Sequence, residues 1–113
     1  MIAWLLAVAC GPAVRFDVDA PPPERLSSTG LVAWTPEEGF TYGAEVVPYD
    51  VNTPLFSNHA VKDRALWIPD GAMTYDPVDA FELPVGSVLL KSFSFPADLR
   101  APDVDLRVIE TRL

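Results

Sequence analysis

Proline is spread through this chain at a spacing that leaves no room for a long helix. The sequence has 12 prolines in 113 residues, about twice the usual share. Pro48, Pro54, Pro69, Pro84 and Pro96 fall between short apolar runs. Proline lacks a backbone N–H and fixes its own φ, so it suits turns and strand ends and interrupts helices. The spacing therefore predicts short extended elements.

The segments between these prolines are typical of β-strands. From Leu31 onward, apolar runs rich in Val, Ile, Phe, Trp and Tyr alternate with turn residues such as Asp70-Gly71. The predicted fold class is all-β, an antiparallel sheet or incomplete β-sandwich with short helical turns, preceded by a disordered N-terminal tether. We expect strands at 44–49, 65–69, 80–83, 87–95 and 105–113, and helical turns near 35–39 and 58–64.

Two charged residues interrupt apolar faces of the last two predicted strands. Lys91 shares a strand face with Phe93, and Glu110 shares one with Val108. An antiparallel register that sets Lys91 opposite Glu110 also sets Phe93 opposite Val108, so it matches cation to anion and aromatic to aliphatic. We therefore predict that Lys91 and Glu110 form a half-buried structural ion pair. The alternative is a proton-handling pair beside a cofactor.

The N-terminus resembles a bacterial export signal that ends in a cysteine. Residues 1–9 are apolar and far too few to span a bilayer, but they fit a short signal peptide. Ala7-Val8-Ala9-Cys10 resembles a lipobox, in which the cysteine is acylated and becomes the first residue. No Lys or Arg precedes the apolar run, and Leu6 lies one place further from Cys10 than usual. The alternatives are ordinary secretion and a free structural thiol.

The predicted domain organisation follows from this signal. Residues 10–30 are expected to form a lipidated cysteine and a Pro/Ser-rich tether, because they contain little contiguous apolar surface to offset the entropy of ordering. Residues 31–113 are expected to form a β-rich domain that continues beyond Leu113, since 107–113 reads as a strand in mid-course. The expected location is the bacterial cell envelope, lipid-anchored through Cys10 and facing the periplasm or the cell exterior.

Charge excludes one class of partner. The formal net charge is −8 and no run of basic residues occurs, whereas nucleic-acid binding needs clustered Lys and Arg. The same acidity disfavours electrostatic adhesion to anionic lipid. Any link to the membrane is therefore expected to be covalent.

The remaining candidate residues do not combine into a recognisable active site. Asp50 and Asn52 have the spacing of calcium ligands, but the sequence that follows departs from a calcium loop. His59 is the only histidine, so it has no second imidazole for a metal site. Ser57 and Ser87 have no base at a recognisable spacing. We therefore expect no enzymatic activity, no catalytic residue and no bound cofactor or metal in this chain.

Several motifs occur in a characteristic order. They are LSSTGL at 26–31, VPYDVNTPLFSNHAVKDR at 47–64, LWIPDG at 66–71, FELPVGSVLLKSF at 81–93 and IETRL at 109–113. Together they resemble a bacterial family of envelope proteins of unassigned role with a β-rich front region and a cytochrome c-like haem segment further on. The resemblance implies a CxxCH haem motif beyond Leu113. Some relatives are joined to propellers similar to quinoprotein sugar dehydrogenases.

Two functions remain open at this point. The first is a non-catalytic β module at the front of a lipid-anchored, c-type cytochrome-like electron-transfer protein, with haem c in the part beyond this chain and a redox protein as partner. The second is a stand-alone small lipoprotein that binds a ligand or a protein through an exposed sheet face. CxxCH is absent from this chain, so the resemblance assigns haem to none of its residues.

Overall fold

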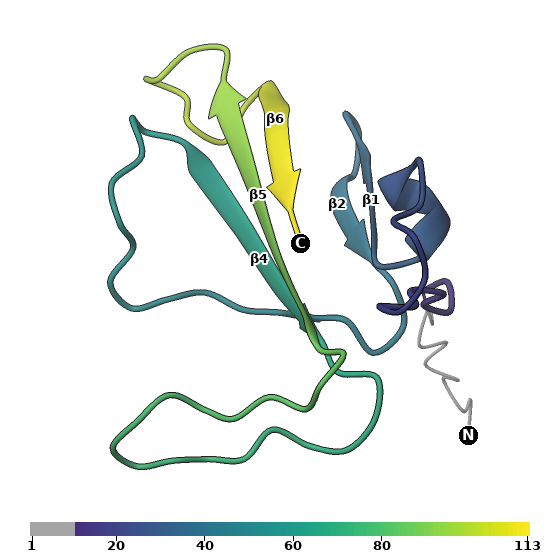
Figure 1. The fold of residues 1–113 in the computed structure, drawn as a ribbon. Helices are drawn as coiled ribbons and strands as arrows, with labels where there is room; N and C mark the ends of the chain where they lie inside the picture. The colour runs from purple at the N-terminus through teal and green to yellow at the C-terminus, as the bar shows by residue number, and fades with distance from the viewer. Residues whose placement is uncertain (1–10) are drawn as a thin grey trace, which may run out of the picture.

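The structure is a computed structural model that describes residues 11–113. The predicted signal peptide at 1–9 and Cys10 lie outside these residues. As predicted, the fold is all-β and consists of two antiparallel sheets (Figure 1). The smaller sheet pairs β1 (Val32–Thr35) with β2 (Gly39–Tyr42). The larger has the order β3 (Val47–Pro48), β4 (Val61–Trp67), β5 (Val88–Pro96) and β6 (Leu106–Arg112), and a single 3-10 turn, η1 (Leu26–Thr29), precedes β1.

The two long ladders of the larger sheet differ in regularity. β4 and β5 pair without interruption, from Val61 opposite Ser94 to Trp67 opposite Val88. Between β5 and β6 the register shifts at a β-bulge: Phe93 lies opposite Glu110 and Ser94 opposite Val108. The bulge inserts an extra residue, Ile109, into β6.

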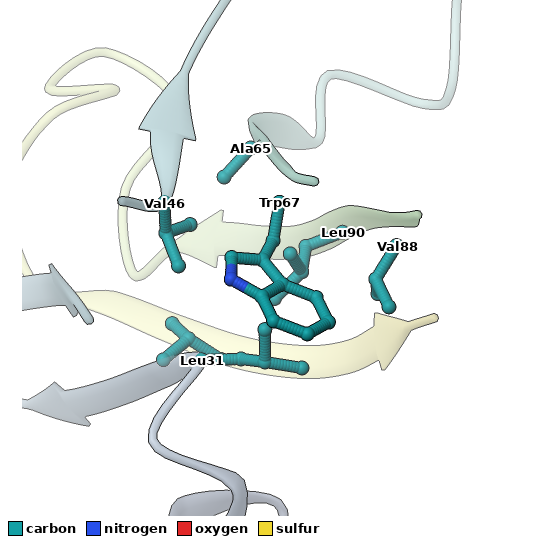
Figure 2. Packing of buried hydrophobic residues seen from close by; sticks show 7 residues of the cluster. Leu31, Val46, Ala65, Trp67, Val88 and Leu90 are labelled. Atoms are coloured by element: carbon teal, nitrogen blue, oxygen red, sulfur yellow. The ribbon is translucent and has the colours of Figure 1, made fainter. Parts of the chain in front are cut away.

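One face of the larger sheet carries the hydrophobic core, and we call it the inner face. Along β5, Val88 and Leu90 are buried, whereas the intervening Leu89 is exposed, because successive strand residues point to opposite faces. Figure 2 shows the indole of Trp67 in the middle of the core cluster. The buried cluster consists of Leu31, Val32, Val46, Ala65, Trp67, Val88 and Leu90, and Phe40 and Tyr42 of β2 pack against it. The smaller sheet therefore lies against the inner face.

The segment before β1 is part of this domain, which corrects the predicted tether over 10–30 for residues 11–30. Val14, Phe16 and Leu26 pack against the core cluster. The Arg15 amide donates to the Thr29 carbonyl at 2.7 Å, and the Thr29 hydroxyl donates to the Leu26 carbonyl and accepts from the Leu31 amide. Apolar residues that are scattered in the sequence are thus gathered by a tight turn, which a search for contiguous apolar runs cannot detect.

Several predicted elements also need correction. The strand expected at 44–49 is reduced to Val47–Pro48, and the strand expected at 80–83 to a single bridge between Thr74 and Glu82. The helical turn expected at 58–64 is mostly the start of β4, because pairing with β5 outweighs local preference. The helical turn expected at 35–39 is the tight turn between β1 and β2, a hairpin that the sequence reasoning missed.

The contact between Gly43 and Gly30 gives a direct test of how residues 11–30 pack. A Cβ on Gly43 would overlap with the Gly30 carbonyl oxygen, whereas a Cβ on Gly39 would meet nothing within 4 Å. Gly39 has φ +71, so Gly39→Ala is expected to cost about 1–2 kcal/mol of conformational strain. Gly43 is not at a positive φ, so Gly43→Ala is expected to cost about 1–3 kcal/mol from overpacking alone. Urea unfolding of both variants measures these losses, and a Gly43→Ala variant as stable as the wild type would contradict this packing.

The inner face also carries a carboxyl group whose ionisation opposes folding. Burial raises the pKa of Asp63, and the neighbouring Arg64 only partly lowers it again. Burial and the negative charge of Asp63 together raise the pKa of Tyr42. The folded state therefore binds the Asp63 proton more tightly than the unfolded state does. The contribution of Asp63 to stability is therefore largest below the ordinary aspartate pKa of about 3.9 and falls as pH rises through the raised value.

This linkage predicts the effect of a neutral side chain at position 63. Asp63→Asn is expected to be more stable than the wild type at neutral pH and to match it at pH values well below about 3.9. Thermal unfolding between pH 3 and pH 8 measures the effect. If the stability of the wild type relative to Asp63→Asn instead increases with pH, the folded state stabilises the Asp63 carboxylate, and the prediction is wrong.

Candidate functional site

The opposite face of the larger sheet, which we call the outer face, gathers most of the basic residues of this acidic chain. Directly paired residues of neighbouring strands project to the same face, so the register assigns the members of each face. Lys62, Arg64, Lys91, Arg107 and Arg112 all lie on the outer face, out of 8 lysines and arginines in the chain.

Three of these cations form a row across adjacent strands, which we call the cation row. Lys91 of β5 lies opposite Arg64 of β4 on one side and opposite Arg112 of β6 on the other. Like charges directly opposite one another destabilise a sheet. Such a local conflict, kept within an otherwise consistent fold, is the kind of feature expected at a functional surface.

The members of the cation row differ in how their charge is balanced. Arg64 is almost buried and lies 2.7 Å from the Asp50 carboxylate. Arg112 donates to the Glu110 carboxylate at 2.6 Å. Within residues 11–113, no carboxylate lies at ion-pair distance from Lys91. Lys91 therefore leaves an unneutralised positive charge in the middle of the row.

The predicted ion pair between Lys91 and Glu110 is therefore corrected. Glu110 lies on the same face as Lys91, but it is opposite Phe93 and binds Arg112. Hydrogen bonds from Arg112 hold the pKa of Glu110 below its usual range. The β-bulge at Phe93 shifts the pairing of β6 with β5, and no residue pattern in either strand predicts this shift.

Phe93 supplies an aromatic surface to the cations on either side. The Lys91 ammonium lies 4.9 Å from the centre of the Phe93 ring, and the Arg112 guanidinium carbon lies 5.0 Å from it. Cation–π attraction at such distances favours both cations beside the ring. It partly offsets the repulsion in the row without neutralising its charge.

Hydrogen bonds and one ion pair hold residues 49–60 against β4, beside the cation row. Asp50 accepts from Arg64, the Tyr49 amide donates to the Arg64 carbonyl at 3.0 Å, and the Lys62 ammonium donates to the Leu55 carbonyl. Leu55 and Phe56 of this segment are strongly exposed. The segment thus presents apolar side chains next to the cations.

The other candidate residues have ordinary structural roles. Asp50 binds Arg64 and its own neighbour's amide, as expected of a turn aspartate. The His59 ring packs edge-on against Phe56, with centroids 5.1 Å apart. The Ser87 hydroxyl donates to the Pro84 carbonyl, while Ser57 accepts the Ala60 amide at its carbonyl in the turn before β4. Among residues 11–113, no three His, Cys, Asp or Glu side chains are grouped closely enough to hold a metal ion.

An apolar groove of about 480 Å³ adjoins the cation row at the Leu66–Leu89 pair. Val47, Phe81 and Leu89 are each about half exposed along it. Sequence reasoning missed this groove, because its wall comes from the long connection between β4 and β5. Its lining consists of Val47, Tyr49, Asp50, Val51, Leu66, Met73, Phe81, Leu83 and Leu89.

Comparison with protein-family models, curated proteins and solved structures finds no match to this chain. The described part of the chain contains no helix of the length and apolar character needed to cross a membrane.

Repulsion within the cation row predicts how salt changes the effect of a substitution at Lys91. Lys91→Met keeps a long apolar stem over Phe93 but removes the central charge. Because the repulsion is screened by salt, the free energy of unfolding of Lys91→Met relative to the wild type is expected to be higher at low salt than at 1 M salt. Arg107→Met is the matched control, because Arg107 lies opposite Phe95 and outside the row. A difference in stability between Lys91→Met and the wild type that salt does not change would contradict the repulsion.

Proposed function

We propose that this chain is a non-catalytic docking module of a bacterial cell-envelope lipoprotein, and that it forms the front part of a c-type cytochrome-like electron-transfer protein. Its outer face binds an acidic, partly apolar surface of the haem-bearing domain. Acylated Cys10 holds the protein at the membrane, facing the periplasm or the cell exterior. Haem c and any redox partner belong to the part beyond this chain.

One observation carries the docking proposal: the cation row lies beside the apolar groove on one face of a chain whose net charge is −8. An acidic partner is repelled by most of such a protein and attracted only to the outer face. The groove supplies apolar contact area, which specific interfaces combine with polar surroundings. The choice of a haem domain rests on the resemblance of the motifs, and the lipid anchor rests on Ala7-Val8-Ala9-Cys10.

A second candidate uses the same surface. In a stand-alone small lipoprotein, the outer face would take a separate ligand or protein in place of a domain of the same protein. The exposed Leu55 and Phe56 beside the cation row favour a partner with an apolar surface in this case too. The two candidate functions differ in whether the binding partner is a domain of the same polypeptide or a separate molecule.

The full-length product purified from membranes of its native host tests the proposed location and the electron-transfer role. We expect a lipid-modified Cys10 by mass spectrometry and covalently bound haem by absorbance. Cys10→Ser is expected to release the protein from the membrane fraction with its haem content unchanged. A haem-free product that ends at Leu113 would favour the stand-alone lipoprotein, and an unmodified Cys10 would contradict the lipid anchor.

Charge reversal tests the docking face separately. In the full-length product, Lys91→Glu combined with Arg112→Glu is expected to increase hydrogen exchange in the haem-bearing domain, because the repelled domain loses its contact with the outer face. Arg25→Glu combined with Arg100→Glu is the matched control, since it reverses the same number of charges at two exposed arginines outside the larger sheet. Equal exchange in both variants would contradict docking through the cation row.

A further inference from the structure

A second cavity, of about 520 Å³, opens between the two sheets, away from the outer face. We call it the acidic cleft. One wall comes from the end of the β1–β2 hairpin, the floor from β4 and β5, and the other wall from the connection that leads into β6. Its lining residues are Trp34, Pro36, Glu37, Glu38, Gly39, Phe40, Asp63, Ser94, Asp103, Asp105 and Leu106.

The charge of the acidic cleft has a single sign. Its carboxylates are those of Glu37, Glu38, Asp63, Asp103 and Asp105, and none of its described lining residues is Lys, Arg or His. Asp63 makes no ion pair with any residue in 11–113. A concave surface lined by one sign of charge focuses its field and raises the local concentration of oppositely charged ligands.

Ser94 at the floor of the cleft is an unpartnered polar group. Its side chain is 1% exposed, and its hydroxyl has no hydrogen-bond partner within residues 11–113. Ser92, on the same strand and the same face, is also buried but shares a hydrogen bond of 2.9 Å with Thr111. Since buried polar groups in folded proteins are nearly always hydrogen-bonded, Ser94 has the position expected of a residue that bonds a ligand.

Aromatic side chains complete the cleft. Trp34 lies directly opposite Phe40 in the β1–β2 ladder, and both line the cavity. Trp34 is 37% exposed, although a large apolar side chain gains stability from burial. Aromatic faces attract organic cations and also pack against methylene chains.

The distances between the carboxylates indicate which class of ligand can neutralise them. They come from three separate segments, the turn after β1, β4 and the approach to β6. No three donors within 11–113 are close enough to share one metal ion. A ligand that neutralises them needs several positive centres joined by an apolar chain, and a cavity of this size lies in the usual range for small molecules.

We propose that the acidic cleft binds a linear polyamine. Its ammonium groups donate to Asp63 and to the carboxylates of the two walls, its methylene chain lies against Trp34 and Phe40, and one N–H donates to the Ser94 hydroxyl. The proposal is independent of the outer face, because the two surfaces share no residue and attract opposite charges.

Spermidine titrated into the full chain by calorimetry at low salt tests the proposal. We expect saturable binding with one site and a change in tryptophan fluorescence. Uncharged 1,8-octanediol is expected not to bind, which shows that the positive centres are needed. Absence of spermidine binding at millimolar concentration, or calcium that displaces spermidine at equal concentration, would overturn the assignment.

Matched variants separate a built site from general attraction to an acidic protein. Asp63→Asn and Ser94→Ala are each expected to weaken spermidine binding about tenfold, because each removes a hydrogen bond made with a charged group. Glu82→Gln removes an exposed charge outside the cleft, and Ser92→Ala removes a buried serine outside it; both are expected to leave the affinity unchanged. Asp63→Asn is expected to fold, since ionised Asp63 opposes folding. Equal weakening by Asp63→Asn and Glu82→Gln would mean non-specific binding and would overturn the proposal.

Discussion

The ladder between β4 and β5 is the constraint on which the rest of this structure depends. Its uninterrupted register sets Ala65 opposite Leu90 and Trp67 opposite Val88, and these pairs form the floor of the core. The same register sets Arg64 opposite Lys91 on the other face. A slip of one residue would exchange the two faces, so core burial fixes the place of the cations as firmly as that of the apolar side chains.

The consequence is a molecule whose two faces differ in sign. The outer face holds the cation row, and the acidic cleft on the inner side gathers carboxylates from segments far apart in the sequence. The cation row sets like charges opposite one another, and none of the residues that line the acidic cleft supplies a positive charge. Both proposals rest on this observation: the chain has two surfaces that each carry one sign of charge and that partners of opposite charge would complement.

The sequence predicted the features that depend on local chemistry. Proline spacing and β-branched runs led to an all-β fold, and β5 and β6 were placed to within about a residue. The bulge at Phe93 and Ser94 was not predictable, since it is a property of the pairing between β5 and β6 and not of the residue pattern of either strand. The short β1–β2 hairpin, the packing of Phe16 and Leu26, and the acidic cleft all arise from contacts between distant segments.

A double-mutant cycle of Lys91→Met and Arg112→Met tests the central claim that these side chains lie side by side in one cation row. Urea unfolding of the wild type, both single variants and the double variant gives the coupling between the two charges. We predict an unfavourable coupling at low salt that declines at high salt. A second cycle measures the coupling between Lys91 and Glu110 in the same way. If Lys91 and Arg112 show no coupling while Lys91 and Glu110 show a favourable one, Lys91 lies opposite Glu110 without a bulge, and the cation row does not exist.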